Sequence, residues 1–100
     1  MKKHHVGQIL VSKETDGSFS VHYYEVIRAT SRTCEIRELK KDITTQMHDE
    51  QEVRPIPGDY VSQPMRRKIN PAGAVQISEN LFAWPWTGTA LWQPAIIFLP

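Results

Sequence analysis

Aromatic and β-branched side chains dominate the segment formed by residues 19–29. Tyr23 occupies an odd position in this segment, and Tyr24 and Val26 occupy even positions, so apolar side chains would lie on both faces of a strand. A strand with apolar side chains on both faces is typical of the middle of a sheet. The pattern therefore predicts a central strand here.

The following segment, residues 33–39, alternates in a different way. Cys34 and Ile36 are apolar, and their neighbours are charged or polar, which is the pattern of a strand with one face in water. A short polar stretch around Ser31 separates this strand from the previous one. We predict a hairpin over residues 23–39 with its turn near Ser31.

Shorter segments on both sides of this hairpin carry weaker strand signals. Prolines and glycines divide them, because proline removes a backbone donor and glycine permits tight turns. The pattern predicts a first strand at 6–11 ended by a turn at Asp16 and Gly17, a short strand and a mobile loop within 40–52, an edge strand or extended segment at 53–60, a second hairpin pairing 66–69 with 74–78, and an extended segment at 81–89.

Short strands separated by turn signals roughly every 8 to 12 residues indicate an all-β fold. We expect a small barrel or a strongly curved antiparallel sheet of about five to seven short strands. A parallel βαβ arrangement is excluded because the sequence lacks helical segments. The length of 100 residues predicts a single domain, residues 1–100.

Composition narrows the classes of protein further. With 40% hydrophobic and 23% charged residues, the chain has the composition of a soluble globular protein. Cys34 is the only cysteine, which excludes an intrachain disulfide and favours a cytoplasmic protein. The apolar stretches near both ends are too short for a signal peptide or a membrane span, so no membrane role is expected.

The order of several short motifs resembles a group of small proteins carried by bacteriophages and other mobile elements. The resemblance covers most of the chain and departs from the group where Thr87 stands in place of aspartate after Trp86. It implies a biological context and no site residue. The motifs are VGQIL at 6–10, YYEVI at 23–27, EIREL at 35–39, VRPIP at 53–57, RRK at 66–68 and AWPWTG at 83–88.

No pattern typical of catalysis or metal binding is present. His4 and His5 are adjacent near a terminus that we expect to be frayed, while His22 and His48 are isolated, so no metal and no cofactor are expected. The alternation around Cys34 predicts a buried, inert thiol. Since phosphate-binding loops and activated nucleophiles are also missing, we predict that the protein is not an enzyme.

One compact basic cluster comprises Arg66, Arg67 and Lys68. The formal net charge is only +1, so binding to nucleic acid would need such a local patch. Further cations could join it if the hairpins are neighbours: Arg28, Arg32, Arg37, Lys40 and Lys41. Two observations argue against the patch, because Arg66 and Arg67 alternate along a strand and because Glu35 and Glu38 lie among the other cations.

All three tryptophans, Trp84, Trp86 and Trp92, lie in the last twenty residues, together with Phe82. Two interpretations stand side by side. The segment either packs into the core and closes the fold, or part of it stays exposed as a contact patch, since tryptophan is enriched at binding hot spots.

These observations lead to two predictions of function. The first is a non-catalytic protein-interaction module that binds or inhibits a host or phage protein, or associates with itself, through Trp84, Trp86, Trp92, Phe82 and Tyr60. The alternative is a small β-barrel that binds nucleic acid through Arg66, Arg67 and Lys68.

Overall fold

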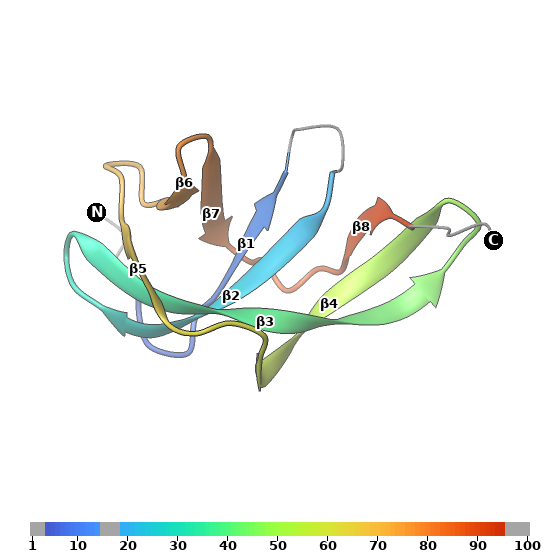
Figure 1. Cartoon of the computed structure of the whole chain (residues 1–100), viewed down its shortest axis with the longest axis horizontal. Coiled ribbons are helices and arrows are strands. Elements are labelled where there is room, and N and C mark those ends of the chain that lie inside the picture. Colours follow the sequence, from blue (N-terminus) through green and yellow to red (C-terminus); the bar gives the residue numbers. More distant parts are fainter. Residues whose placement is uncertain (1–3, 15–18, 96–100) are drawn as a thin grey trace.

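The computed structural model describes residues 4–14 and 19–95, which contain eight strands and no helix (Figure 1). The all-β prediction is therefore confirmed, with more strands than the expected five to seven. The strands are β1 (Ile9–Lys13), β2 (Val21–Ala29), β3 (Thr33–Gln46), β4 (Glu50–Tyr60), β5 (Met65–Lys68), β6 (Val75–Ser78), β7 (Leu81–Pro85) and β8 (Leu91–Pro94). The predicted turn at Asp16 and Gly17 and the last five residues of the apolar C-terminal segment lie outside the described residues.

The strands form one antiparallel sheet in the order β6-β7-β1-β2-β3-β4-β8, and β5 pairs with β3 outside this path. The predicted hairpin of residues 23–39 is confirmed as β2 and the first half of β3. The region 40–52 was expected to hold a short strand and a loop, but β3 continues through it to Gln46. β3 and β4 thus form a long hairpin that projects from the rest of the molecule (Figure 1).

β3 uses one edge for two partners. Its first half pairs with β5, from Thr33 to Ile36, and its second half pairs with β4 from Leu39 onward. The predicted hairpin between residues 66–69 and 74–78 is confirmed only next to its turn, where Ile69 bridges Val75, because β5 otherwise lies against β3 and β6 lies against β7. The backbone N–H of Asn70 also donates to the carbonyl oxygen of Ala74, and the side chain of Arg67 donates to that of Ile77.

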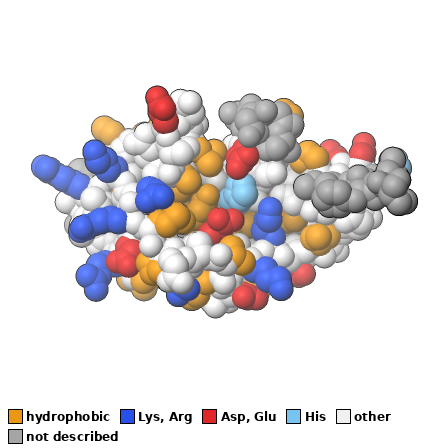
Figure 2. Space-filling model, in the orientation of Figure 1, with side chains coloured by type: hydrophobic (Ala, Val, Ile, Leu, Met, Phe, Trp, Pro, Cys, Tyr) orange, Lys and Arg blue, Asp and Glu red, His pale blue; other side chains and the backbone are white. Residues whose placement is uncertain are grey.

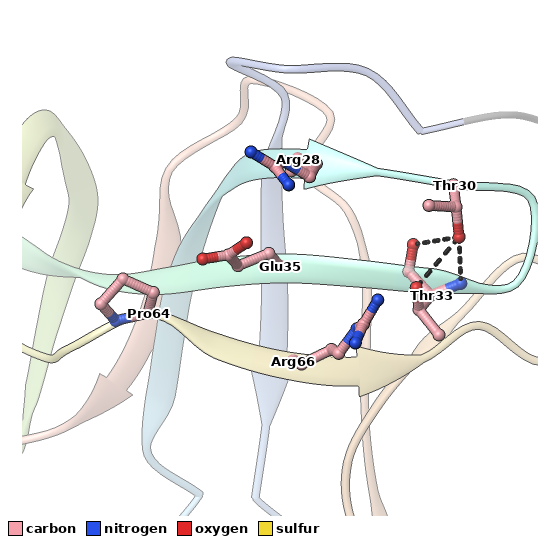
Figure 3. Close-up of a pocket in the computed structure, with 6 residues that line it drawn as sticks. All are labelled: Arg28, Thr30, Thr33, Glu35, Pro64 and Arg66. Atoms are coloured by element: carbon pink, nitrogen blue, oxygen red, sulfur yellow. Dashed lines mark hydrogen bonds between the residues drawn. The ribbon is translucent and has the colours of Figure 1, made fainter.

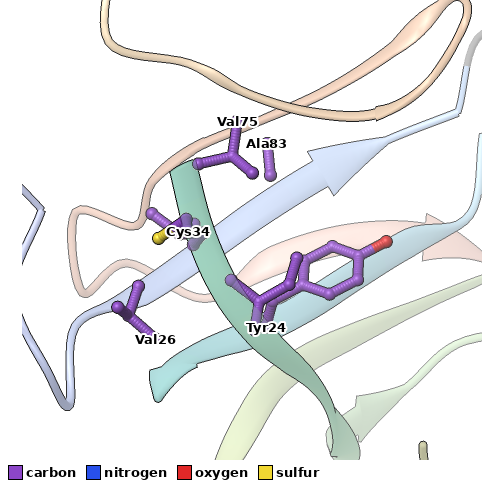
Figure 4. Packing of buried hydrophobic residues seen from close by; sticks show 7 residues of the cluster. Tyr24, Val26, Cys34, Val75 and Ala83 are labelled. Atoms are coloured by element: carbon purple, nitrogen blue, oxygen red, sulfur yellow. The ribbon is translucent and has the colours of Figure 1, made fainter. Parts of the chain in front are cut away.

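The shortness of this backbone pairing also explains why the predicted barrel is not formed. Among the described strands no continuous ladder joins β5 to β6, so the sheet stays open. The sheet nevertheless bends, because side chains of β6 and β7 reach the same core cluster as those of β2 and β3 (Figure 4). The fully buried side chains of this cluster include Val26, Cys34, Ile36, Val75 and Ala83.

A second core cluster lies on the opposite face of β2. Val21 and Tyr23 pack there against Leu39 and Val53. The hydroxyl of Tyr23 is fully buried and donates a hydrogen bond to the carbonyl oxygen of Val53 at 3.1 Å, so this polar atom is satisfied inside the core. β2 is therefore a central strand with two buried faces, as the sequence predicted.

Two isoleucines of β3 test this division between core and surface. We expect Ile36→Ala to lower the free energy of unfolding by about 2–4 kcal/mol, because Ile36 is fully buried and its loss leaves a cavity. We expect the matched Ile43→Ala to cost less than about 1 kcal/mol, because 52% of Ile43 is exposed. Urea denaturation measures both values, and equal losses would contradict the arrangement of the core.

Candidate functional site

Strand pairing brings two basic segments, far apart in the sequence, to one end of the sheet. β2 pairs with β3 so that Arg28 stands opposite Glu35, and β5 pairs with β3 so that Arg66 stands opposite the same glutamate. Directly opposed residues in antiparallel strands point to the same face. Arg28, Glu35 and Arg66 therefore form a row across three strands.

A neighbouring row begins at Thr33, which stands opposite Lys68 of β5. Arg32 lies in the turn between β2 and β3, next to this row, and its carbonyl oxygen accepts a hydrogen bond from the backbone of Ile69. We call the four exposed cations at this end, Arg28, Arg32, Arg66 and Lys68, the basic surface. Figure 2 shows Lys and Arg side chains gathered at this end of the molecule.

The side chains of the basic surface lack partners in the described part of the chain. None of the four makes a side-chain hydrogen bond or ion pair within residues 4–14 and 19–95, and the carboxylate of Glu35 makes none either. Arg28, Glu35 and Arg66 line a hollow of about 330 Å³ together with Thr30, Thr33 and Pro64 (Figure 3). The donors of the two arginines and the acceptors of Glu35 are therefore open to solvent in this hollow.

Arg67, the third member of the predicted cluster, is turned away from the basic surface. It stands opposite buried Cys34, on the other face of β5, and its Nε donates a hydrogen bond to the carbonyl oxygen of Ile77 at 3.1 Å. The alternation of Arg66 and Arg67 expected from the sequence is present. Because β5 pairs with β3, the other cations of the basic surface beside Arg66 and Lys68 are Arg28 and Arg32, and not Arg67.

Two other cations that could have joined the cluster hold the fold together instead. The guanidinium of Arg37 lies 4.1 Å from the ring centroid of Tyr60, and its Nε donates to the carbonyl oxygen of Ser62. The ammonium of Lys41 donates to the carbonyl oxygen of Val21 at 2.7 Å, and burial lowers its pKa. Neither side chain belongs to the basic surface.

The opposite end of the molecule has the opposite charge. The projecting hairpin carries four acidic side chains between residues 42 and 54, against the single cation Arg54: Asp42, Asp49, Glu50 and Glu52. The molecule is 47 Å long, against 26 and 24 Å in the other directions. The formal net charge of +1 therefore conceals two separated regions of opposite sign.

Two of the predicted aromatic contact residues are used in packing. Trp86 meets Tyr23 edge to face, with ring centroids 5.8 Å apart, and its Nε1 donates to the carbonyl oxygen of Thr89. The hydroxyl of Tyr60 donates to the carboxylate of Glu25 at 2.6 Å, a hydrogen bond that raises the pKa of Tyr60. Both aromatic residues pack against the second core cluster.

The remaining tryptophans are partly exposed but lie on different parts of the sheet. Trp84 is on β7 and Trp92 is on β8, with β1, β2, β3 and β4 between them in the strand order. Phe82, also on β7, is half-buried. Trp84 lines a second hollow, of about 430 Å³, with His4, Pro85 and several neighbours. The structure therefore does not gather the three tryptophans into one patch.

Two histidines have closer partners than the sequence suggested. His4 is buried, and its Nε2 lies 2.6 Å from the carbonyl oxygen of Gly73, so the expectation of a frayed terminus at this residue is wrong. His22 lies between the carboxylates of Glu14 and Glu38, at 2.9 and 3.1 Å. The carboxylates contact different ring nitrogens of His22. No grouping of three or more possible ligands for a metal ion occurs in the described part of the chain.

Comparison with protein-family models, curated proteins and solved structures gives no significant match to this chain. The resemblance to proteins of phages and mobile elements stays a prediction.

Trp84 and Trp86 test which tryptophan side chains near β7 contribute to the core. We expect Trp86→Ala to lower the free energy of unfolding by about 3 kcal/mol, because the edge-to-face contact with Tyr23 and the apolar packing are lost. We expect Trp84→Ala, at a side chain that is 48% exposed, to cost about 1 kcal/mol or less. Chemical denaturation checks both, and unfolding of the Trp84 variant would show that this residue belongs to the core.

The thiol of Cys34 provides a further test. Burial raises its pKa to about 11, and its side chain is fully buried. Because only the thiolate attacks a disulfide reagent, we expect native protein to react with such a reagent at pH 8 far more slowly than protein unfolded in guanidinium. Equal rates in the two states would contradict the burial of Cys34.

Proposed function

We propose that this protein is a non-catalytic domain that binds nucleic acid through its basic surface. The observation that carries the proposal is the pairing of β5 with β3, which sets Arg66 and Lys68 beside Arg28 and Arg32 at one end of the molecule. None of the four side chains has a partner among the described residues. Phosphate groups are the natural partners of such cations, because each contact releases counterions from the polyanion.

The distribution of charge supports the same interpretation. The acidic residues of the β3–β4 hairpin lie away from the basic surface, so they do not repel a polyanion bound there. The four cations make no ion pairs within the described residues, so no such ion pair has to break when a phosphate binds. Each phosphate contact contributes about −0.7 to the salt slope for a single strand.

A non-catalytic role agrees with the surroundings of the reactive groups. The single thiol is buried, and the two ring nitrogens of His22 are both occupied by carboxylates. We place the protein in the cytoplasm because a single cysteine is typical of a reducing compartment. The structure contains no helix within residues 4–14 and 19–95 that could cross a membrane.

Protein binding is a second proposal, and the exposed face of Trp84 favours it. This side chain borders the hollow formed with His4 and Pro85, and a half-exposed tryptophan beside a hollow is typical of a contact with another protein. In a phage or mobile element, such a contact would occupy the surface of a host or phage protein. The two surfaces lie on different strands and do not exclude each other.

Two double variants with the same change in net charge test the proposed nucleic-acid binding. Arg66→Ala with Lys68→Ala removes two cations of the basic surface, whereas Lys13→Ala with Lys40→Ala removes two exposed cations elsewhere. We expect the first pair to weaken binding of a fluorescent single-stranded oligonucleotide and to reduce the salt slope by about 0.7 per lost contact. Fluorescence anisotropy at a series of salt concentrations measures both quantities.

The control pair should leave the salt slope unchanged. Equal effects of the two pairs would mean that net charge, and not the basic surface, governs binding. Failure of the unmodified protein to bind at low salt would overturn the proposal.

A further inference from the structure

The hollow between Arg28 and Arg66 contains a carboxylate as well as two guanidinium groups. Glu35 stands between the two arginines in the strand register and belongs to the lining of the hollow. In Figure 3 the carboxylate of Glu35 points toward Pro64, and the guanidinium of Arg66 points toward Thr33. The charges of the row therefore alternate from positive to negative to positive.

This alternation does not suit a phosphate group alone. Phosphate oxygens only accept hydrogen bonds and would be repelled by Glu35. A ligand that complements the whole row must donate to the carboxylate and accept from the guanidinium groups. Within a nucleic acid, the bases carry several donors and acceptors side by side on one planar edge, whereas the ribose of RNA adds only the single 2′-OH.

Guanine complements the row better than the other bases. Its O6 and N7 accept a bidentate pair of hydrogen bonds from arginine, and its N1–H and N2 amino group donate from the adjacent edge to a carboxylate. Adenine and cytosine each offer a single amino group to Glu35. The volume of about 330 Å³ lies near the lower end of the range of small-molecule sites, which suits one base and its sugar.

We infer that the hollow between Arg28 and Arg66 is a base-binding subsite that accepts a guanine from single-stranded nucleic acid. Glu35 accepts hydrogen bonds from N1–H and N2, and Arg28 donates to O6 and N7. Arg66 points toward Thr33, the residue opposite Lys68, so Arg66 and Lys68 hold the neighbouring phosphates. This inference rests on the proposed binding of nucleic acid and adds a preference among the bases.

Oligothymidylates with one central replacement test the inference. Fluorescence anisotropy compares four labelled strands whose central base is thymine, guanine, adenine or hypoxanthine, the last being guanine without its N2 amino group. We expect the strand with guanine to bind about tenfold more tightly than the strand with thymine or adenine. Hypoxanthine should fall in between, because it keeps O6, N7 and N1–H. A single guanine per strand avoids four-stranded structures.

Glu35→Gln is the decisive variant, because it keeps the size of the side chain and removes the charge that accepts from N1–H and N2. We expect it to abolish the preference for guanine and to leave the salt slope within experimental error of the unmodified protein. The matched control is Glu79→Gln, since Glu79 is near Arg66 and Lys68 but lines a separate hollow. The control should keep the preference for guanine. Urea denaturation checks that both variants fold.

The possible outcomes separate this inference from the proposed function. Equal affinity for all four strands, with tighter binding of all four by Glu35→Gln, would show that the hollow holds only phosphate. That result would overturn the guanine subsite and leave nucleic-acid binding intact. Absence of binding to every strand at low salt would overturn both.

Discussion

The architecture depends on the length of β3 and on the way its outer edge is divided. One half of this edge pairs with β5 and the other half with β4, while the other edge pairs with β2 from Cys34 to Leu39, in the first half of β3. Backbone hydrogen bonds along one continuous strand thus fix three neighbours in register. If β3 ended at Leu39, β4 would lose most of its partner residues and the projecting hairpin would not form.

The same pairing connects the core to the basic surface. In the first half of β3, Cys34 and Ile36 point into the core beneath β6 and β7, whereas Thr33 and Glu35 point to the other face. A shift of one residue between β3 and β5 would exchange these two sets of side chains. Burial of Cys34 and Ile36 therefore holds Glu35 opposite Arg66, and packing on one face determines the chemistry of the other.

Local patterns in the sequence were sufficient for the central part of the fold. The apolar side chains at both odd and even positions around Tyr23 and Tyr24 predicted a strand buried on both faces. The alternation around Cys34 predicted a buried thiol. The pairing of β5 with β3 could not be predicted, because it joins residues about thirty positions apart and no local turn specifies it. The polar composition after Lys40 hid the continuation of β3, since an exposed ladder of backbone hydrogen bonds leaves no hydrophobic pattern. The sequence placed Glu35 among cations, but its position between Arg28 and Arg66 depends on the pairing of β3 with β2 and β5.

The separation of charge along the 47 Å axis has a kinetic consequence. A molecule with a basic end and an acidic hairpin carries an electric dipole moment, and under the proposed binding of nucleic acid the field of the polyanion would exert a torque on it before contact. Rotational diffusion is then biased so that the basic end leads, and a larger share of collisions is productive than the small net charge suggests. Ions at physiological strength confine this guidance to about the last 8 Å of the approach. Over that short range, the field of the polyanion acting on the separated charges of the protein would select the orientation in which it arrives.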